Sequence, residues 1–278
     1  MATLRQLALS GRISEARRAL SDLKHGDGLE LSPTDSQALD HWEWVLSPLW
    51  WLELKHGRIF LRRASSIDRA FFERCQYDQQ FVKRFNRRWA SGFDLQRLLW
   101  QSENLPPLHV GVMYWTVVVD GIPRGISSLA GIDQLNRHAE FSIGFPDKPD
   151  AGIALKTSLM VIHFALWMLG LHKLIAYIYE DNESAKRNAQ HLGFQIEGIL
   201  GDHFFFNNEP TSVAVFGLTR NQVLANPSLT RIARRTISQR WIEESSPAFG
   251  KCSFQYLDPP AITSIPIANS SRAREHMT

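Results

Sequence analysis

The sequence predicts a mixed α/β fold built on one central sheet, and two observations predict it. Three apolar, β-branched strand patterns follow one another within 113–145 with no helical pattern between them. A helical pattern at 151–170 and a strand pattern at 174–179 then form a crossover. Sequential strands followed by a strand–helix–strand unit indicate a mostly antiparallel sheet flanked by helices.

Residues 1–56 are predicted to form an N-terminal helical extension. Ser14 is a suitable N-cap for a helix over 15–23, and Ser32 and Pro33 precede a helix that reaches Leu46. The following segment is rich in tryptophan, with Trp42, Trp44, Trp50 and Trp51. Either these indoles are buried against the main domain, or they form a surface that binds a protein partner or a second copy, or that covers a substrate.

The main domain is predicted over 57–225. It opens with a strand at 58–62 and a helix at 69–77, for which Ser66 or Asp68 is the expected N-cap. Further helices are predicted at 80–89 and 95–100. A hairpin follows, in which Asp120 and Gly121 form the turn.

The second half of this domain begins with the strand at 138–145. After the crossover, Ser184 is the expected N-cap of a helix over 184–192, and three short strands close the sheet, at 196–199, 202–207 and 212–218. The apolar run at 158–171 is shorter than the roughly 20 residues of a spanning helix, so no membrane span is expected.

Net charge and cysteine spacing argue against a nucleic-acid-binding, metal-binding or secreted protein. The chain of 278 residues has a formal net charge of +3, which is too small to predict nucleic acid as the main partner. Cys75 and Cys252 have no metal-ligand spacing and no disulfide framework, and the N-terminus lacks a secretory pattern, so a reducing, cytoplasmic location and no metal site are expected.

The C-terminal segment, 226–278, is predicted to be a basic helix over 228–241 and a loosely held tail. Four arginines lie on that helix, which is the pattern of a solvated face. They are Arg231, Arg234, Arg235 and Arg240.

The segment from 138 to 170 has the pattern of an anion-binding site. A strand leads through a loop with small residues into a long helix, where unpaired amides and the helix dipole point at one spot. Gly152 and Ala154 allow close approach to the backbone. Asp150 has an alternative role as a plain N-cap, which would occupy the same amides.

The chain resembles the GNAT superfamily of acyl-CoA-dependent N-acyltransferases over about 57–220. The resemblance rests on AEFSIGF at 139–145, DAGIA at 150–154 and NESAKRNAQHLGFQIEG at 182–198. Within the superfamily it is similar to the branch of ribosomal-protein N-terminal and small-amine or amino-sugar acetyltransferases. It implies a sheet with splayed central strands and acetyl-CoA as acyl donor.

The resemblance also implies which residues contact the donor. Its pyrophosphate would lie on the loop before the long helix, where Pro149 departs from the family's Gln or Arg and Lys148 supplies a nearby charge. Asn182 and Ser184 would contact the pantetheine arm. The implied cofactor-binding set is Ile143, Gly144, Phe145, Lys148, Gly152, Ile153, Ala154, Asn182 and Ser184.

For catalysis, the resemblance implies that the backbone at 143–145 polarises the thioester carbonyl. Strand alternation places Glu140 and His138 on one face. Glu140 is the expected general base, with His138 in reserve, although a structural carboxylate is an open alternative. Ala189 stands where many relatives have a tyrosine acid, so Tyr177, Tyr179 or water would protonate the thiolate.

The sequence therefore predicts acetyl transfer from acetyl-CoA to a primary amine by direct attack. The acceptor is a small-molecule amine or a protein N-terminal amine. Two alternatives remain open: a non-catalytic binding module of the same fold, and an acyltransferase that uses a longer acyl-CoA or an acyl-carrier protein.

Overall fold

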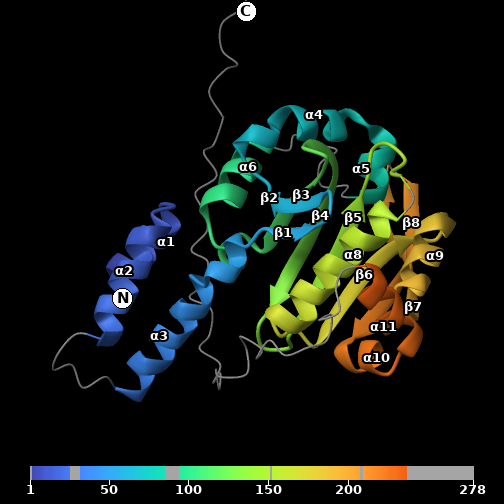
Figure 1. Ribbon diagram of the computed structural model, residues 1–278. Coiled ribbons are helices and arrows are strands. Elements are labelled where there is room, and N and C mark those ends of the chain that lie inside the picture. The colour runs from blue at the N-terminus through green and yellow to red at the C-terminus, as the bar shows by residue number, and fades with distance from the viewer. Residues whose placement is uncertain (1, 26–31, 86–93, 151, 207–208, 237–278) are drawn as a thin grey trace, which may run out of the picture.

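The computed structural model describes residues 2–25, 32–85, 94–150, 152–206 and 209–236. They form one eight-stranded sheet in the order β1-β2-β3-β4-β5-β6-β8-β7 (Figure 1). Neighbouring strands are antiparallel, except that β5 and β6 are parallel. The strands are β1 (Leu54–His56), β2 (Ile59–Arg63), β3 (Val112–Val119), β4 (Ile122–Asp133), β5 (His138–Gly144), β6 (Lys173–Tyr179), β7 (Gln195–Phe206) and β8 (Glu209–Thr219).

The β3–β4 hairpin is confirmed. Asp120 and Gly121 have φ values of 51° and 80°, the left-handed region that a two-residue hairpin turn requires. Aspartate tolerates that region better than most residues, and glycine enters it without a steric cost. The hairpin fixes the register of the strands that carry the functional site.

Helices cover both faces of the sheet, as alternate side chains of β3 show. Met113, Trp115 and Val117 lie in the core with α8 (Ile153–His163) and the π-helical turn Phe164–Met168 that continues it. Tyr114 lies in a second core. That core is formed with α4 (Arg69–Tyr77), α5 (Gln79–Phe85) and α6 (Leu95–Asn104).

The crossover between the parallel strands is also confirmed. It runs through α8, and Gly170 ends the helical stretch with a φ of 73°. No helix in the described part of the chain has the length and hydropathy needed to cross a membrane.

The N-terminal extension consists of α1 (Ala2–Leu9), α2 (Ile13–His25), α3 (Pro33–Val45) and a 3₁₀ turn at Pro48–Trp51, and it lies to the left of the sheet in Figure 1. One prediction for it is wrong, because β1 adds an edge strand to the sheet before residue 57. Trp44 and Trp50 are buried in the core that contains α8, which confirms the buried alternative for these two indoles.

Arg63 connects this extension to the sheet through hydrogen bonds and a cation–π contact. The Arg63 guanidinium on β2 donates to the carbonyls of Trp50 (3.2 Å) and Leu105, and lies 4.6 Å from the centre of the Trp51 ring. Arg17 of α2 packs on the same ring at 5.1 Å. Burial lowers the pKa of Arg63 to about 9, so the side chain is still charged at neutral pH.

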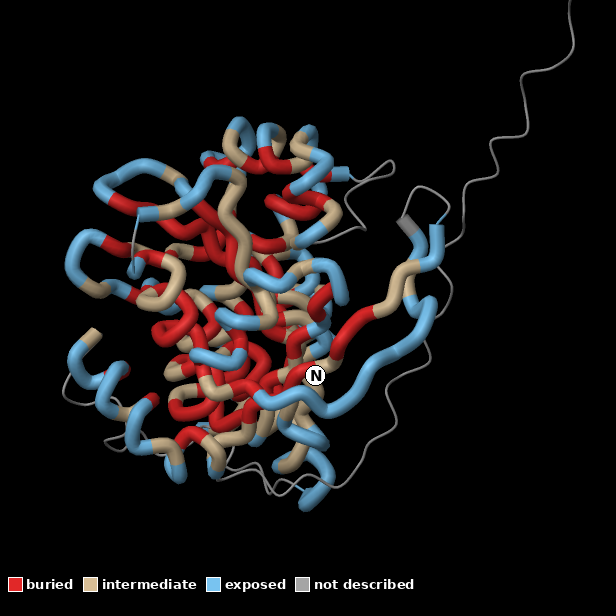
Figure 2. Tube along the Cα trace, turned by 90° about the vertical axis from the view of Figure 1, so that its right-hand side faces the viewer, coloured by how far each residue is buried: buried red, intermediate tan, exposed pale blue. Residues whose placement is uncertain are grey.

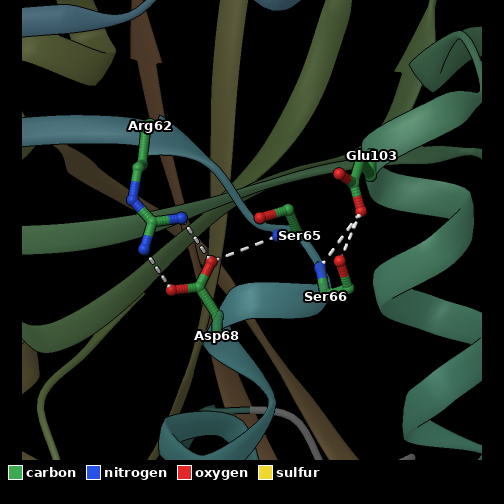
Figure 3. Close-up of polar contacts among 5 residues, drawn as sticks. All are labelled: Arg62, Ser65, Ser66, Asp68 and Glu103. Atoms are coloured by element: carbon green, nitrogen blue, oxygen red, sulfur yellow. Dashed lines mark hydrogen bonds and ion pairs between the residues drawn. The ribbon is translucent and has the colours of Figure 1, made fainter.

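The cap of α4 differs from the prediction and forms a closed polar cluster (Figure 3). Asp68 holds the N-cap position, but its side chain makes no cap hydrogen bond. Instead its carboxylate accepts two bonds from Arg62, at 2.6 and 2.7 Å, and one from the backbone N–H of Ser65 at 3.1 Å. Ser66 donates its N–H and its hydroxyl to Glu103 of α6, at 3.1 and 3.0 Å.

The C-terminal part contains α9 (Glu183–His191), α10 (Arg220–Leu224) and α11 (Pro227–Thr236). The strands predicted at 196–199 and 202–207 form one long strand, β7, which bulges against β8 between Leu200 and Phe204. The β7–β8 hairpin projects from the body, and β7 is exposed along nearly all of its described length (Figure 2). The predicted tail, with Arg240, lies outside the described residues.

Candidate active site

The site begins where β5 and β6 separate. Their ladder pairs three positions, from His138 with Lys173 to Glu140 with Ile175. Beyond that point β5 keeps its pairing with β4 as far as Gly144, and β6 keeps its pairing with β8 as far as Tyr179. The backbone groups of β5 that point towards β6 after Glu140 therefore have no strand neighbour on that side.

A cavity of about 1550 Å³ fills the opening between the two strands. Its walls come from both faces of the sheet. On one face lie Gly152, Leu155 and Ser158 at the start of α8, together with residues of α9. On the other face lie Leu98 and Ser102 of α6.

Strand alternation explains how one cavity reaches both faces. Phe141 and Ile178 belong to the core that contains α8. Glu140 and Tyr177 alternate with them and point towards α6. Because all four side chains line the cavity, it passes through the sheet at the separation of β5 and β6. We call its α8 side the donor chamber and its α6 side the acceptor chamber, after the roles that we propose for them below.

The start of α8 is open for an anion. Gly152 occupies the N-cap with a φ of 85°, no side-chain hydrogen bond caps the helix, and a Cβ atom there would meet nothing within 4 Å. The alternative role for Asp150 is wrong, because its carboxylate pairs with Arg58 at 2.7 Å instead of capping the helix. The Ile153 N–H donates to the Asp150 carbonyl at 3.2 Å, but the helix start and its dipole face the donor chamber without a competing carboxylate.

The predicted loop residues divide into two groups. Gly152 and Ala154 line the cavity, whereas the Ile153 side chain is 6% exposed and lies in the core. Lys148 is exposed and does not line the cavity. The structure therefore brings the backbone of this loop, and not the predicted cation, to the donor chamber.

On α9, Asn182 takes the place predicted for Ser184. The Asn182 carboxamide oxygen accepts the Ala185 N–H at 3.2 Å and caps the helix, so Ser184 as N-cap is wrong. Asn182 lines the cavity, and Ser184 is exposed outside it. Ala189 is 7% exposed and also lines the cavity, where its small side chain leaves room.

At the end of β5, Ile143 lines the cavity and its two successors do not. Gly144 lies against Phe81 and Phe85, so that a Cβ atom would approach both rings to 2.8 Å. The Phe145 ring covers Gly125, where a Cβ atom would lie 2.6 Å from it. These contacts fix the backbone of the strand end next to the opening.

Glu140 and His138 end up in different surroundings. Glu140 is half-buried, stands at the last paired position of the β5–β6 ladder and lines the cavity. His138 lies at the opposite end of the ladder, with its Nε2 3.7 Å from an Asp133 carboxylate oxygen, and does not line the cavity. Of the two predicted residues, Glu140 is the one that lines the cavity.

The two tyrosines proposed as proton donors both line the acceptor chamber. Tyr179 is 8% exposed, while Tyr177 is 37% exposed and stacks on His203 at 6.5 Å. Either phenol lies on the same strand face as Glu140, as the pairing of Glu140 with Ile175 dictates.

Sequence reasoning missed the cavity-facing side of α6. Asp94, Arg97, Leu98, Gln101 and Ser102 line the cavity. Their spacing of three or four residues places them on one helix face. The signal is present as polar residues at core spacing, but a short helix with three leucines by itself predicts only packing on the sheet.

Covalent chemistry through Cys75 has no support in the geometry. Its thiol is buried in the second core and does not line the cavity, and burial raises its pKa to about 12. In the described part of the chain, His, Cys, Asp and Glu side chains form no cluster of three that suits a metal ion.

Comparisons with known proteins agree with this geometry. Residues 58–195 match the family model described as acetyltransferase (GNAT) domain. Spermidine N(1)-acetyltransferase of Escherichia coli (strain K12) is 30% identical over 112 residues, which is 40% of this chain and 60% of that protein. The uncharacterized N-acetyltransferase YoaA of Bacillus subtilis is 28% identical over 87 residues, 30% of this chain and 49% of that protein. The matched segments thus cover only part of each relative.

Solved structures share the fold. Mycobacterium smegmatis RimJ in complex with CoA-disulfide superposes with a TM-score of 0.55 at 17% identity, covering 68% of this chain and 98% of that one. Spermidine N-acetyltransferase from Vibrio cholerae in complex with CoA and spermine gives a TM-score of 0.52 at 21% identity, covering 60% and 98%.

Proposed function

Residues 58–195 belong to the GNAT acetyltransferase domain family, and on that premise we propose that the chain transfers the acetyl group of acetyl-CoA to a primary amine. The observation that carries the proposal is the cavity through the sheet at the β5–β6 separation. An open helix start faces one side of it and Glu140 the other. A thioester and an amine can therefore meet there from opposite faces.

On the donor side, the chain supplies backbone groups. The amides of the first α8 turn would hold the pyrophosphate of acetyl-CoA, since phosphates favour uncapped helix N-termini. Gly152 permits this approach because it has no Cβ atom. The free backbone edge of β5 around Ile143 would hydrogen-bond the thioester carbonyl and stabilise the oxyanion that develops there.

On the acceptor side, Glu140 would take a proton from the ammonium, directly or through one water molecule. The neutral amine nitrogen then attacks the thioester carbon, the C–S bond breaks, and the thiolate leaves. Tyr179, Tyr177 or water returns a proton to that sulfur. The balance is one amine and acetyl-CoA giving one amide and free CoA.

The acceptor is a small-molecule amine or a protein N-terminal amine. We also infer a reducing, cytoplasmic setting, because Cys75 is a free, buried thiol. A second copy or a protein partner remains a proposal for the N-terminal extension, although its Trp44 and Trp50 are used inside the molecule.

The first experiment measures acetyl-CoA binding by calorimetry and CoA release with a panel of primary amines. We expect Glu140→Gln to lower kcat roughly 10²- to 10³-fold, as for loss of a general base, while the Kd of acetyl-CoA stays unchanged. Glu73→Gln, on an exposed face of α4, is the matched control and should retain full activity.

Two results would count against the proposal. Absence of acetyl-CoA binding at millimolar concentration would favour the non-catalytic binding module instead. Undiminished turnover in Glu140→Gln would remove that carboxylate from the mechanism. If only longer acyl-CoA donors supported transfer, the proposed acyl transfer to an amine would stand, but acetyl-CoA would not be the donor.

A further inference from the structure

The acceptor chamber has an unusual wall for a helix that packs on a sheet. The side of α6 that faces the cavity carries a guanidinium, a carboxamide and a hydroxyl, from Arg97, Gln101 and Ser102. Leu98 and Tyr114 supply apolar surface beside them. A helix that only packed would turn apolar side chains to this side, so the polar groups need another reason.

Ser102 gives the sharpest sign of a ligand. The residue is 3% exposed, and its hydroxyl has no hydrogen-bond partner among the described residues. Of the buried side chains without a partner in the described ranges, it alone lines the cavity. Buried hydroxyls are nearly always paired, so this one fits a polar atom that arrives with the acceptor.

The charged side chains around the acceptor chamber favour an acceptor that carries a negative charge. Arg84 and Arg97 are exposed residues that line the cavity, and neither forms an ion pair with another described residue. Asp94 is the nearest carboxylate in sequence, but its Oδ1 caps α6 by accepting the Arg97 N–H at 2.9 Å. Arg97 also lies in the first turn, where the helix dipole favours an anion.

A polycation fits this wall poorly. Spermidine, which appears in the names of the relatives, carries several ammonium groups, and each needs a carboxylate or a similar acceptor. Besides the capping residue Asp94, Glu140 is the carboxylate that lines the cavity among the described residues. It is already assigned to the reacting nitrogen, which leaves two guanidiniums facing the remaining charges of a polyamine.

We propose that the acceptor is a primary amine that also carries an anionic group, a carboxylate or a phosphate. Arg97 binds that anion, with Arg84 adding charge at the rim, and Ser102 donates its hydroxyl to a polar atom of the same molecule. The ammonium end then lies at Glu140, on the sheet side of the chamber. This inference rests on the proposed acetyl transfer and names its substrate class.

Matched amines of one chain length test it in the intact protein. 4-Aminobutyrate, butylamine and 1,4-diaminobutane differ only in the terminal group, and O-phosphoethanolamine against ethanolamine distinguishes a phosphate from a carboxylate. We expect kcat/KM to be highest for one of the two acidic amines. Arg97→Gln should lower that value roughly 10-fold or more, as for loss of a charged hydrogen bond, and leave butylamine unchanged.

Two further variants separate binding from folding. Arg97→Lys keeps the charge and should recover part of the loss. Arg18→Gln, on an exposed position of α2, is the matched control and should behave as the unmodified protein. A higher kcat/KM for the diamine, or an Arg97→Gln variant that slows all amines equally, would overturn the inference while acetyl transfer itself stands. Absence of CoA release with every amine would instead defeat the proposed function.

Discussion

Two buried polar side chains, Asp68 at the start of α4 and Ser102 on α6, differ in their hydrogen bonding. Asp68 is 1% exposed, and its carboxylate accepts three hydrogen bonds, two from Arg62 and one from Ser65 (Figure 3). Ser102 is 3% exposed, and its hydroxyl has no partner in the described part of the chain. Glu103, the next residue along α6, joins the first cluster through Ser66. Of these neighbouring residues on α6, Glu103 thus belongs to the polar cluster, and Ser102 lines the acceptor chamber.

This difference in hydrogen bonding distinguishes a residue that stabilises the fold from a residue that we propose contacts a ligand. A buried group whose hydrogen bonds are complete contributes to stability, and its loss leaves its partner unsatisfied. A buried polar group without a partner costs stability, because it has lost its hydrogen bonds to water, until a ligand supplies a partner. The same reasoning distinguishes the Asp150 carboxylate, which pairs with Arg58, from the start of α8, which no side chain caps.

The largest effect on stability is expected from a substitution that breaks the ion pair between Arg62 and Asp68. Asp68→Asn removes one of two carboxylate oxygens from a buried arginine pair, and it should lower the free energy of unfolding by about 3 kcal/mol. Urea unfolding at pH 7 measures it. Activity per folded molecule should stay the same, since neither Arg62 nor Asp68 lines the cavity.

Asp120→Asn provides the control for that change. Asp120 also pairs with an arginine, Arg58, but both side chains are more than half exposed, at 56% and 52%. Its loss should cost less than about 1 kcal/mol. Equal losses in the two variants would show that burial of the Arg62 pair adds nothing to stability.

A smaller effect is expected from a substitution in the acceptor chamber, and it should appear in KM and not as a loss of stability. Ser102→Ala removes a buried hydroxyl that has no partner among the described residues, so the free energy of unfolding should stay the same or rise by up to about 1 kcal/mol. With the preferred acidic amine, KM should rise roughly fivefold for one lost hydrogen bond. A stability loss without a change in KM would mean that the hydroxyl serves the fold.

The smallest effect concerns the half-buried imidazole of His163. His163 ends α8 and stacks on Trp167 at 6.0 Å, and burial lowers its pKa from 6.5. In the window below 6.5 the unfolded chain binds a proton that the folded chain does not, so stability falls as pH falls through that window. His163→Gln should lose less stability than the unmodified protein between about pH 7.5 and about pH 5, by about 1 kcal/mol or less; identical pH slopes would contradict this.

Much of the fold could be predicted because the signals are local. The Asp120-Gly121 turn sets the hairpin, and the helix over Arg69–Tyr77 matches its predicted bounds. The predictions that failed depend on pairings between elements, which the residue pattern of a single element does not show. β1 is a strand because β2 lies beside it, and β7 is continuous because β8 pairs along its length. Asp68 leaves its cap for Arg62, which no local pattern announces.

The candidate site divides in the same way. Motifs within 138–198 were sufficient to predict the strand–loop–helix, because turn chemistry and strand alternation act over a few residues. The resemblance singled out Glu140 and Asn182, which both line the cavity, and their roles stay predictions. Only the tertiary structure decided where the β5–β6 ladder stops, and that α6, from before the hairpin, forms the acceptor wall. It also decided which buried polar groups are satisfied, as Asp68 is, and which remain open, as Ser102 does. A hydrogen-bond partner is a matter of three-dimensional proximity, which sequence spacing does not encode.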